Sequence, residues 1–265
     1  MSSRYPANDP PIERTGGVRV LTWNLFHGRA DPPAGRPLLH EFATTLARWE
    51  WDVALLQEVP PWWPPALATA CGARAFSVPT SRNALPGVRR AIAARRPDLL
   101  KSNGGGANAI LVRGTGPVTA HARLRLRACP ERRVLHAVRL GPRATWVANV
   151  HCQKGSWEDA AGLAIPGADL ARCFAALDRW FASDGDPAQE PDVMLGGDLN
   201  LPADAVDAAL PDGWARIATS GPDHVLARGR SAAGSPSRPD RGTLSDHAAL
   251  MVTARAVAGR PAAGA

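Results

Sequence analysis

The sequence predicts a single α/β domain built from two stacked mixed β-sheets covered by helices. Short apolar runs of strand length recur from residue 18 to residue 250, and these runs outnumber the helical patterns. Helical periodicity and strictly alternating patterns both occur, which indicates that helical crossovers are mixed with antiparallel hairpins. No linker divides the chain, and 265 residues fit one unit of this kind. Such a pattern favours sheets with helices on their outer faces.

The first half of the chain alternates strands with helices. Residues 1–16 are polar and Pro-rich, and we expect a flexible lead-in to a domain that spans residues 17–256. Residues 18–24 predict a strand, and apolar residues three and four positions apart predict an amphipathic helix over 38–49. Residues 51–59 form a nearly continuous apolar run, which is typical of a strand buried on both faces.

The second half is richer in strands. Residues 118–141 alternate apolar with polar side chains, which predicts a half-exposed hairpin. Further strands are expected at 145–151 and 193–197, with a helix over 166–182 between them whose apolar residues share one stripe. Two strands near the C-terminus flank a loop rich in Gly, Ser and Pro, and residues 257–265 are expected to form a flexible tail.

Composition argues against several classes of protein. The four Cys lack C-x-x-C spacing, which argues against a zinc site and against a disulfide framework. The N-terminus has no apolar core of a secretory signal, and no apolar run approaches the length of a membrane span. We therefore expect a cytoplasmic monomer that does not insert into membranes.

The chain is strongly basic, with a formal charge of +7 and a pI near 10.2. A basic surface attracts phosphate polyanions such as nucleic acids. All but two of the 31 basic residues are Arg in a chain rich in Ala, Gly and Pro, so coding bias explains the charge equally well. Segment 82–101 could bind a nucleic-acid backbone or be an ordinary solvated helix. Its candidate substrate contacts are Arg89, Arg90, Arg95 and Arg96.

Side chains that suit a divalent metal and a phosphate ester stand at the ends of the expected strands. They are Asn24, Glu58, His151, Asp198, Asn200, Asp223, Asp246 and His247. A phosphodiester resists attack, so a catalyst must neutralise its charge, generate a hydroxide and assist the leaving oxygen. Hard Mg²⁺, with Mn²⁺ as a possible substitute, performs the first task when a few carboxylates hold it. The set therefore predicts a metal-dependent phosphodiesterase site.

Three of these residues are assigned to the metal. Glu58 is the expected principal ligand, because a carboxylate that ends a buried strand is costly unless a cation compensates it. Asn24 could orient Glu58, a metal-bound water or a phosphate oxygen. Asp246 is expected to bind the metal or its water. The alternatives are a capping or surface role for Glu58 and a turn role for Asn24.

The other five residues are assigned to proton transfer and phosphate binding. Asp198 and Asn200 of G-G-D-x-N point to one face because strand periodicity is two; Asp198 would position or deprotonate water and Asn200 would bind phosphate. His247 would be a general base or a phosphate contact, and Asp223 would fix its tautomer. His151 would contact phosphate or protonate the leaving group.

Asn149 faces the same side of its strand as His151, and it could support substrate binding or be structural. The remaining histidines have no comparable context, and no role is assigned to them. They are His27, His40, His121, His136 and His224.

The motifs T-W-N, L-Q-E, N-V-H, G-D-L-N, P-D-H and S-D-H occur in this order between about residue 18 and residue 252. In this order they resemble the endonuclease/exonuclease/phosphatase superfamily, which includes DNase I-like nucleases and exonuclease III-like abasic-site endonucleases. The resemblance implies a four-layer α/β sandwich with the site at one end of the two sheets. It also implies Mg²⁺-dependent hydrolysis of phosphoester bonds, with the roles given above for the eight strand-end residues.

The substrate is less closely defined than the chemistry. A nucleic acid is the favoured substrate, cleaved internally, from an end, or in the processing of DNA ends. His151 resembles the DNase I and sphingomyelinase branches, whereas LLQEVPPWWPPAL and GGDLNLP resemble the tyrosyl-DNA phosphodiesterase branch. A phosphatase or lipid-headgroup phosphodiesterase on the same scaffold is the alternative. A catalytically silent nucleic-acid-binding module is an alternative of another class.

Overall fold

The computed structural model describes residues 17–80, 85–99, 106–114, 116–141, 145–182 and 192–257. The expected lead-in and all but one residue of the expected tail lie outside the described residues, so those two predictions stay untested. Within the described residues, twelve strands form two six-stranded sheets, and each sheet contains parallel and antiparallel neighbours.

The elements have the following bounds. The order of the first sheet is β11 (Arg230–Ala232), β12 (Leu250–Ala256), β1 (Val18–Asn24), β2 (Val53–Val59), β4 (Ala107–Val112) and β3 (Arg74–Pro79). The order of the second sheet is β5 (Val118–Arg127), β6 (Arg133–Leu140), β7 (Thr145–His151), β8 (Val193–Asp198), β10 (Asp223–Arg228) and β9 (Trp214–Ser220). The helices are α1 (Leu39–Arg48), α2 (Pro64–Cys71), α3 (Pro86–Ala93), α4 (Ala160–Ala182) and α5 (Ala203–Ala209), with short 3-10 turns η1 (Phe26–Gly28) and η2 (Pro97–Leu99).

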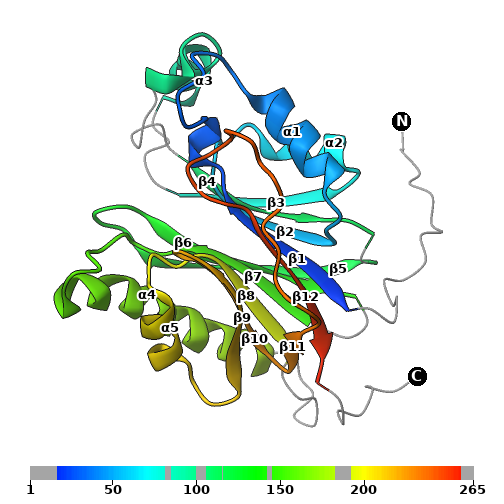
Figure 1. Ribbon diagram of the computed structural model, residues 1–265, viewed down its shortest axis with the longest axis vertical. Coiled ribbons are helices and arrows are strands. Elements are labelled where there is room, and N and C mark those ends of the chain that lie inside the picture. Colours follow the sequence, from blue (N-terminus) through cyan, green and yellow to red (C-terminus); the bar gives the residue numbers. More distant parts are fainter. Residues whose placement is uncertain are drawn as a thin grey trace.

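Helices cover the outer faces of the two sheets, so the molecule has four layers (Figure 1). Phe42 of α1 and Leu67 of α2 belong to the core on the outer face of the first sheet. Leu55 and Val147 belong to the core between the sheets, and Phe174 of α4 belongs to the core outside the second sheet. Each such side chain contributes roughly 1.5–3 kcal/mol when it is fully buried. This architecture confirms the predicted four-layer sandwich.

A parallel pair of strands lies at the centre of each sheet. β1 pairs with β2, and β7 pairs with β8. The carboxyl ends of parallel strands meet at one edge, so each pair ends at a single rim. A hydrogen bond of 3.1 Å from Asn24 Nδ2 to Asp198 Oδ2 joins the end of β1 to the end of β8. The rims of the two sheets therefore coincide, as the polar strand ends predicted.

A network of buried amides fastens the two sheets together behind this rim. Asn149 Oδ1 accepts a hydrogen bond of 2.8 Å from Gln57 Nε2, and Asn149 Nδ2 donates to the carbonyl oxygens of Leu56 and Ala109 at 2.9 Å. Asn149 has no exposed surface. The structure therefore places it between the sheets instead of beside a substrate, which corrects its assignment as a substrate contact.

Helix α4 begins six residues before the predicted start, at Ala160. Its first turns contain Gly162 and Pro166, two residue types with low helix propensity. Tertiary packing is close at this point, because a Cβ on Gly162 would lie 2.4 Å from the carbonyl oxygen of Ser156. Among the described residues α4 is the one helix long and apolar enough to cross a membrane. Its apolar residues, such as Leu170, cover the second sheet, so the core of the domain accounts for that composition.

Candidate active site

The polar residues at the rim come from both sheets. Glu58 lies near the end of β2, and His151 ends β7. Asp223 begins β10, which runs antiparallel to β8, so its Cα pairs with that of Asp198 at the end of β8. His247 precedes β12; its backbone N–H donates to Ser245 Oγ, which in turn donates to the carbonyl oxygen at the end of β1. Six segments of the chain thus meet at one place.

Asp198 lies at the centre of this cluster. Its Oδ2 accepts the hydrogen bond from Asn24 Nδ2, and its Oδ1 accepts one of 3.0 Å from the backbone N–H of Asn200. His151 Nε2 lies 3.4 Å from Asp198 Oδ2, and His247 Nε2 lies 3.8 Å from the same oxygen. One carboxylate therefore faces two imidazoles and is held from behind by two donors.

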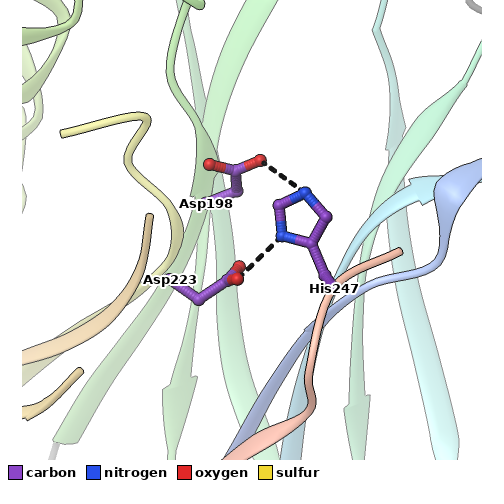
Figure 2. A group of neighbouring side chains, drawn as sticks. All are labelled: Asp198, Asp223 and His247. Carbon is purple, nitrogen blue, oxygen red and sulfur yellow. Dashed lines mark hydrogen bonds and ion pairs between the residues drawn. The ribbon is translucent and has the colours of Figure 1, made fainter. Parts of the chain in front are cut away.

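The carboxyl groups of Asp223 and Asp198 face the two ring nitrogens of His247 (Figure 2). Asp223 Oδ2 lies 2.8 Å from His247 Nδ1, which is the contact that the sequence predicted. Although burial opposes a charged imidazole, the hydrogen bond with Asp223 and the charges of Asp223, Asp198 and Asp246 raise the pKa of His247 to about 9. Burial and the charge of Asp223 raise the pKa of Asp198 to about 7. At neutral pH the cluster therefore pairs an imidazolium with a carboxyl group that can take up a proton.

Glu58 occupies a distortion in β2. The register of β2 with β4 shifts between Leu56 and Val59, and Glu58 has a φ of 50°. Such a bulge turns a side chain out of the sheet, and bulges are frequent next to active sites. The Glu58 side chain is 22% exposed, and its Oε2 lies 3.0 Å from His27 Nε2. Burial opposes ionisation, but the hydrogen bond with His27 and the charges of His27, His151 and Arg133 lower the pKa of Glu58 far below its ordinary value.

His151 connects the two halves of the site. Its Nε2 faces Asp198, and its Nδ1 lies 4.0 Å from Glu58 Oε1. Burial and the charge of Arg133 lower the pKa of His151 well below 6.5. The imidazole is therefore neutral, and it can accept a proton, donate one or bind a cation.

The other predicted members lie close to this cluster in different environments. Asn200 Nδ2 donates to the carbonyl oxygen of Cys152 at 3.0 Å, which leaves one amide hydrogen for a ligand. Asn24 Oδ1 accepts a hydrogen bond from the backbone N–H of Phe26, so its amide orients Asp198 and the following turn. Asp246 is exposed, and within the described part of the chain it forms no hydrogen bond or ion pair with the other site residues.

The basic segment forms α3 and the turns that follow it. Arg90, Arg95 and Arg96 are exposed, and Arg89 is half-buried. Arg90 borders a cavity of about 270 Å³ that it shares with Trp62, Trp63 and His27. Since His27 touches Glu58, this cavity adjoins the rim. Two further basic residues of the segment, Arg82 and Lys101, lie outside the described residues.

Two residues of the site were not identified from the sequence. His27 follows the first strand by three positions in a turn that shows no periodic pattern. Arg133 belongs to an alternating run that predicts a half-exposed hairpin, but it is buried and its Nε donates to Gln153 Oε1 at 3.3 Å. Its charge acts on both Glu58 and His151. For His27, the sequence offered one signal, which is that a histidine can pair with an acidic residue such as Glu58. For Arg133 it offered none.

Two groups of residues could hold a cation. Asp198, Asp223 and His247 offer ligand atoms within 4.8 Å of one another. However, these two carboxyl groups are buried and share the charged imidazole of His247, which compensates one of them. Glu58 is ionised, partly exposed and flanked by imidazole nitrogens, and carboxylate with imidazole is a donor set that divalent ions accept. The residues present therefore fit a divalent cation, and Glu58 would be its principal carboxylate.

The fold and the site together define a hydrolase of phosphate esters. The chain belongs to the Endonuclease/Exonuclease/phosphatase family, whose model matches residues 21–247. This finding confirms the resemblance found in the sequence motifs. No curated protein matches the chain in sequence.

Several solved structures share the fold at low sequence identity. An endonuclease/exonuclease/phosphatase from Beutenbergia cavernae is 18% identical with a TM-score of 0.64, over 91% of this chain and 72% of that one. Danio rerio TDP2, solved with a single-strand DNA product, is 15% identical with a TM-score of 0.61, over 90% of this chain and 98% of that one. A mannosyl-6-phosphatase of Bacteroides thetaiotaomicron is 13% identical with a TM-score of 0.58, over 90% and 99% of the two chains. At these identities the likeness establishes the fold alone.

Proposed function

We propose that the protein is a divalent-metal-dependent phosphodiesterase that hydrolyses single-stranded nucleic acid. The observation that carries the chemistry is the position of His151, which lies 3.4 Å from Asp198 and 4.0 Å from Glu58. The imidazole of His151 therefore lies between Asp198, in the cluster proposed for proton transfer, and Glu58, the carboxylate proposed to bind the cation. A phosphate group bound beside His151 would contact both halves of the site.

The roles of the residues follow from their charges. Glu58 would hold the cation, which when bound would neutralise the phosphate and lower the pKa of an attacking water. Asp198, with a pKa of about 7, accepts the proton of the attacking water near neutral pH. His247 is cationic and donates a hydrogen bond from Nε2 to a phosphate oxygen, while Asp223 holds its Nδ1. The free amide hydrogen of Asn200 supports the same phosphate.

The loop between β7 and α4 supports a nucleic-acid substrate. Trp157 is 46% exposed, and its indole N–H donates to the carbonyl oxygen of Asn200 at 2.8 Å. Close packing fixes the loop, because a Cβ on Gly155 would lie 2.0 Å from the carbonyl oxygen of Gly162. A fixed, exposed indole beside the reacting group suits stacking on a base, which is sequence-tolerant. Lys154 is exposed in the same loop and suits a backbone phosphate.

Charge and structural likeness agree with this substrate. The net charge of +7 favours a polyanion, and the Danio rerio TDP2 neighbour was solved with a single-strand DNA product. A phosphatase is the second candidate, because a neighbour of the same fold is a mannosyl-6-phosphatase. The full set of site side chains argues against a silent binding module. Since all of them come from one chain, we propose that the monomer is active.

The test is hydrolysis by the purified protein with Mg²⁺ or Mn²⁺ across a panel of substrates. The panel holds single- and double-stranded DNA, RNA, a 5′-tyrosyl oligonucleotide, sphingomyelin, sugar phosphates and bis-p-nitrophenyl phosphate, with the Glu58→Gln protein as blank. We expect turnover of single-stranded nucleic acid that requires the metal and is absent from the blank. Turnover of sugar phosphates or lipid alone would replace the nucleic-acid substrate with the second candidate. Inertness toward every compound would overturn the enzymatic assignment.

A further inference from the structure

His27 is placed beside Glu58 by an unusual backbone. Its φ is 55° and its ψ is 27°, and Phe26 before it has a φ of 48°. Residues with a side chain seldom adopt this left-handed conformation, and such positions cluster where function requires them. The His27 side chain is only 14% exposed, and its Nε2 lies 3.0 Å from Glu58 Oε2. The turn therefore directs an imidazole at the carboxylate.

The turn that carries His27 is fixed at both ends. The backbone N–H of Phe26 donates to Asn24 Oδ1 at 3.0 Å, and that of Gly28 donates to the carbonyl oxygen of Leu25 at 2.7 Å. Gly28 has no room for a side chain, because a Cβ there would lie 2.3 Å from the ring of Trp63. The position of His27 is thus determined by the fold and does not depend on its contact with Glu58.

The contacts of the His27 ring differ from those of a structural histidine. Its Nδ1 is buried and has no hydrogen-bond partner within the described part of the protein. Glu58 is therefore the one polar group shown to hold the ring. A buried histidine with a structural role normally uses its polar atoms in hydrogen bonds. Two donors bound to one octahedral ion at about 2.1 Å and at right angles lie about 3.0 Å apart. The observed separation of 3.0 Å between His27 Nε2 and Glu58 Oε2 permits shared ligation and equally fits a hydrogen bond, so metal binding has to distinguish the two.

We propose that His27 is a ligand of the same ion as Glu58, and that it shifts the preference of the site from Mg²⁺ toward Mn²⁺ and related first-row ions. Mg²⁺ is a hard ion that takes oxygen ligands almost exclusively. Imidazole nitrogen favours first-row transition ions, so one nitrogen ligand lowers the relative affinity for Mg²⁺. This inference rests on the metal dependence proposed above. A histidine that only orients Glu58 by a hydrogen bond would not produce this preference.

The test measures metal binding directly. His27→Asn is the variant, because Asn tolerates the left-handed backbone and its side chain is too short to reach the ion. His40→Asn, which removes an exposed histidine of α1, is the matched control. Electron spin-echo modulation of bound Mn²⁺ reports coupling to ligand nitrogen, and calorimetric titration gives the affinities for Mn²⁺ and Mg²⁺. His151 and His247 are present in both variants, so the difference isolates His27.

We expect ¹⁴N coupling in the wild-type protein that is reduced or lost in His27→Asn and kept in His40→Asn. The same variant should lose about 10-fold or more in Mn²⁺ affinity and much less in Mg²⁺ affinity. Unchanged ¹⁴N coupling, or equal losses for the two ions, would overturn the role of His27 as a ligand. Glu58→Gln separates the two proposals: if that variant binds Mn²⁺ as tightly as the wild type, the metal site itself is misplaced.

Discussion

The two halves of the site differ in how they handle charge. On the first sheet, Glu58 keeps its negative charge and lies beside the imidazoles of His27 and His151. The buried carboxyl groups of Asp198 and Asp223, on the second sheet, share one cationic imidazole, that of His247 from the loop before β12. Both halves contain acid and histidine, but the acids of the second half are buried around a charged imidazole, whereas the Glu58 side chain is partly exposed and can receive an added cation. Proximity of acidic residues is therefore a poor guide to a metal site unless their existing partners are counted.

The largest expected effect separates the halves by activity and metal binding together. Glu58→Gln and Asp198→Asn should each lower turnover by roughly 10³-fold or more, because each removes a group that acts on the reacting phosphate or water. Calorimetry should show that only Glu58→Gln loses the divalent ion. If Asp198→Asn abolished metal binding and Glu58→Gln retained it, the two roles would have to be exchanged.

The same two variants should change stability in opposite directions at pH 8. The pKa of Asp198 is raised in the folded protein, so its ionisation destabilises the fold above about pH 4, and Asp198→Asn should raise the melting temperature. The pKa of Glu58 is lowered, so its charge stabilises the fold above that pH, and Glu58→Gln should lower the melting temperature. Metal-free protein at pH 8 and pH 4 gives the comparison. The Asp198 difference should shrink at pH 4, where the folded carboxyl is protonated, whereas the Glu58 difference should largely persist, because the pKa of Glu58 in the folded protein lies far below that pH. Shifts of equal sign at pH 8 would contradict the assigned charges.

The sequence predicted the strand ends better than the surroundings of the side chains. Glu58 and Asp198 follow apolar runs, and parallel strands bring such ends to one rim, whereas His247 precedes β12, which runs antiparallel to β1 and so starts at the same rim. Alternation also predicted that Asn149 and His151 share a face, but that face lies between the sheets, and only the last residue of β7 reaches the site. Periodicity predicts which face of a strand a side chain occupies, but it does not predict how close that side chain lies to the rim.

His27 and Arg133 were missed by the sequence prediction for a different reason. His27 depends on a single left-handed turn, and three residues are too few to show a period. Arg133 resembled part of a half-exposed hairpin, because its burial depends on a distant acceptor, Gln153, which lies 20 residues further along the chain. Non-local pairing of this kind leaves no local pattern. Helix α4 shows the same limit, since tertiary packing overrides its Gly and Pro.

A moderate effect sharpens the account of the second half. Asp223→Asn removes the main group that raises the pKa of His247, so in metal-free protein that pKa should fall by about one unit or more from about 9. NMR titration of the His247 Cε1–H signal measures it directly. In the same variant the alkaline fall in kcat/KM, which follows loss of the His247 proton, should move to lower pH. An unchanged titration would show that Asp223 does not set the charge of this imidazole.

A smaller effect concerns the substrate rather than the reacting group. Trp157→Leu should raise KM for single-stranded oligonucleotides by about 10-fold, because stacking contributes about 1–3 kcal/mol per base, with a much smaller change in kcat. Trp157→Phe keeps an aromatic face and should restore most of the affinity, whereas a merely structural indole would make the two variants alike. Fluorescence anisotropy of a labelled oligonucleotide, with unchanged melting temperatures as a check, makes the measurement.

The smallest expected effect tests whether the basic segment takes part in binding. Arg90 is exposed on α3 and borders the cavity next to His27, so Arg90→Ala should remove one phosphate contact. The slope of log Kd against log salt for a single strand should then change by about 0.7, which is the value for one neutralised phosphate. Arg48→Ala, at the far end of α1, is the matched control, because it removes one exposed charge without approaching the rim. Equal slopes for the two variants would show that net charge alone attracts the substrate, and the basicity of α3 would then reflect composition.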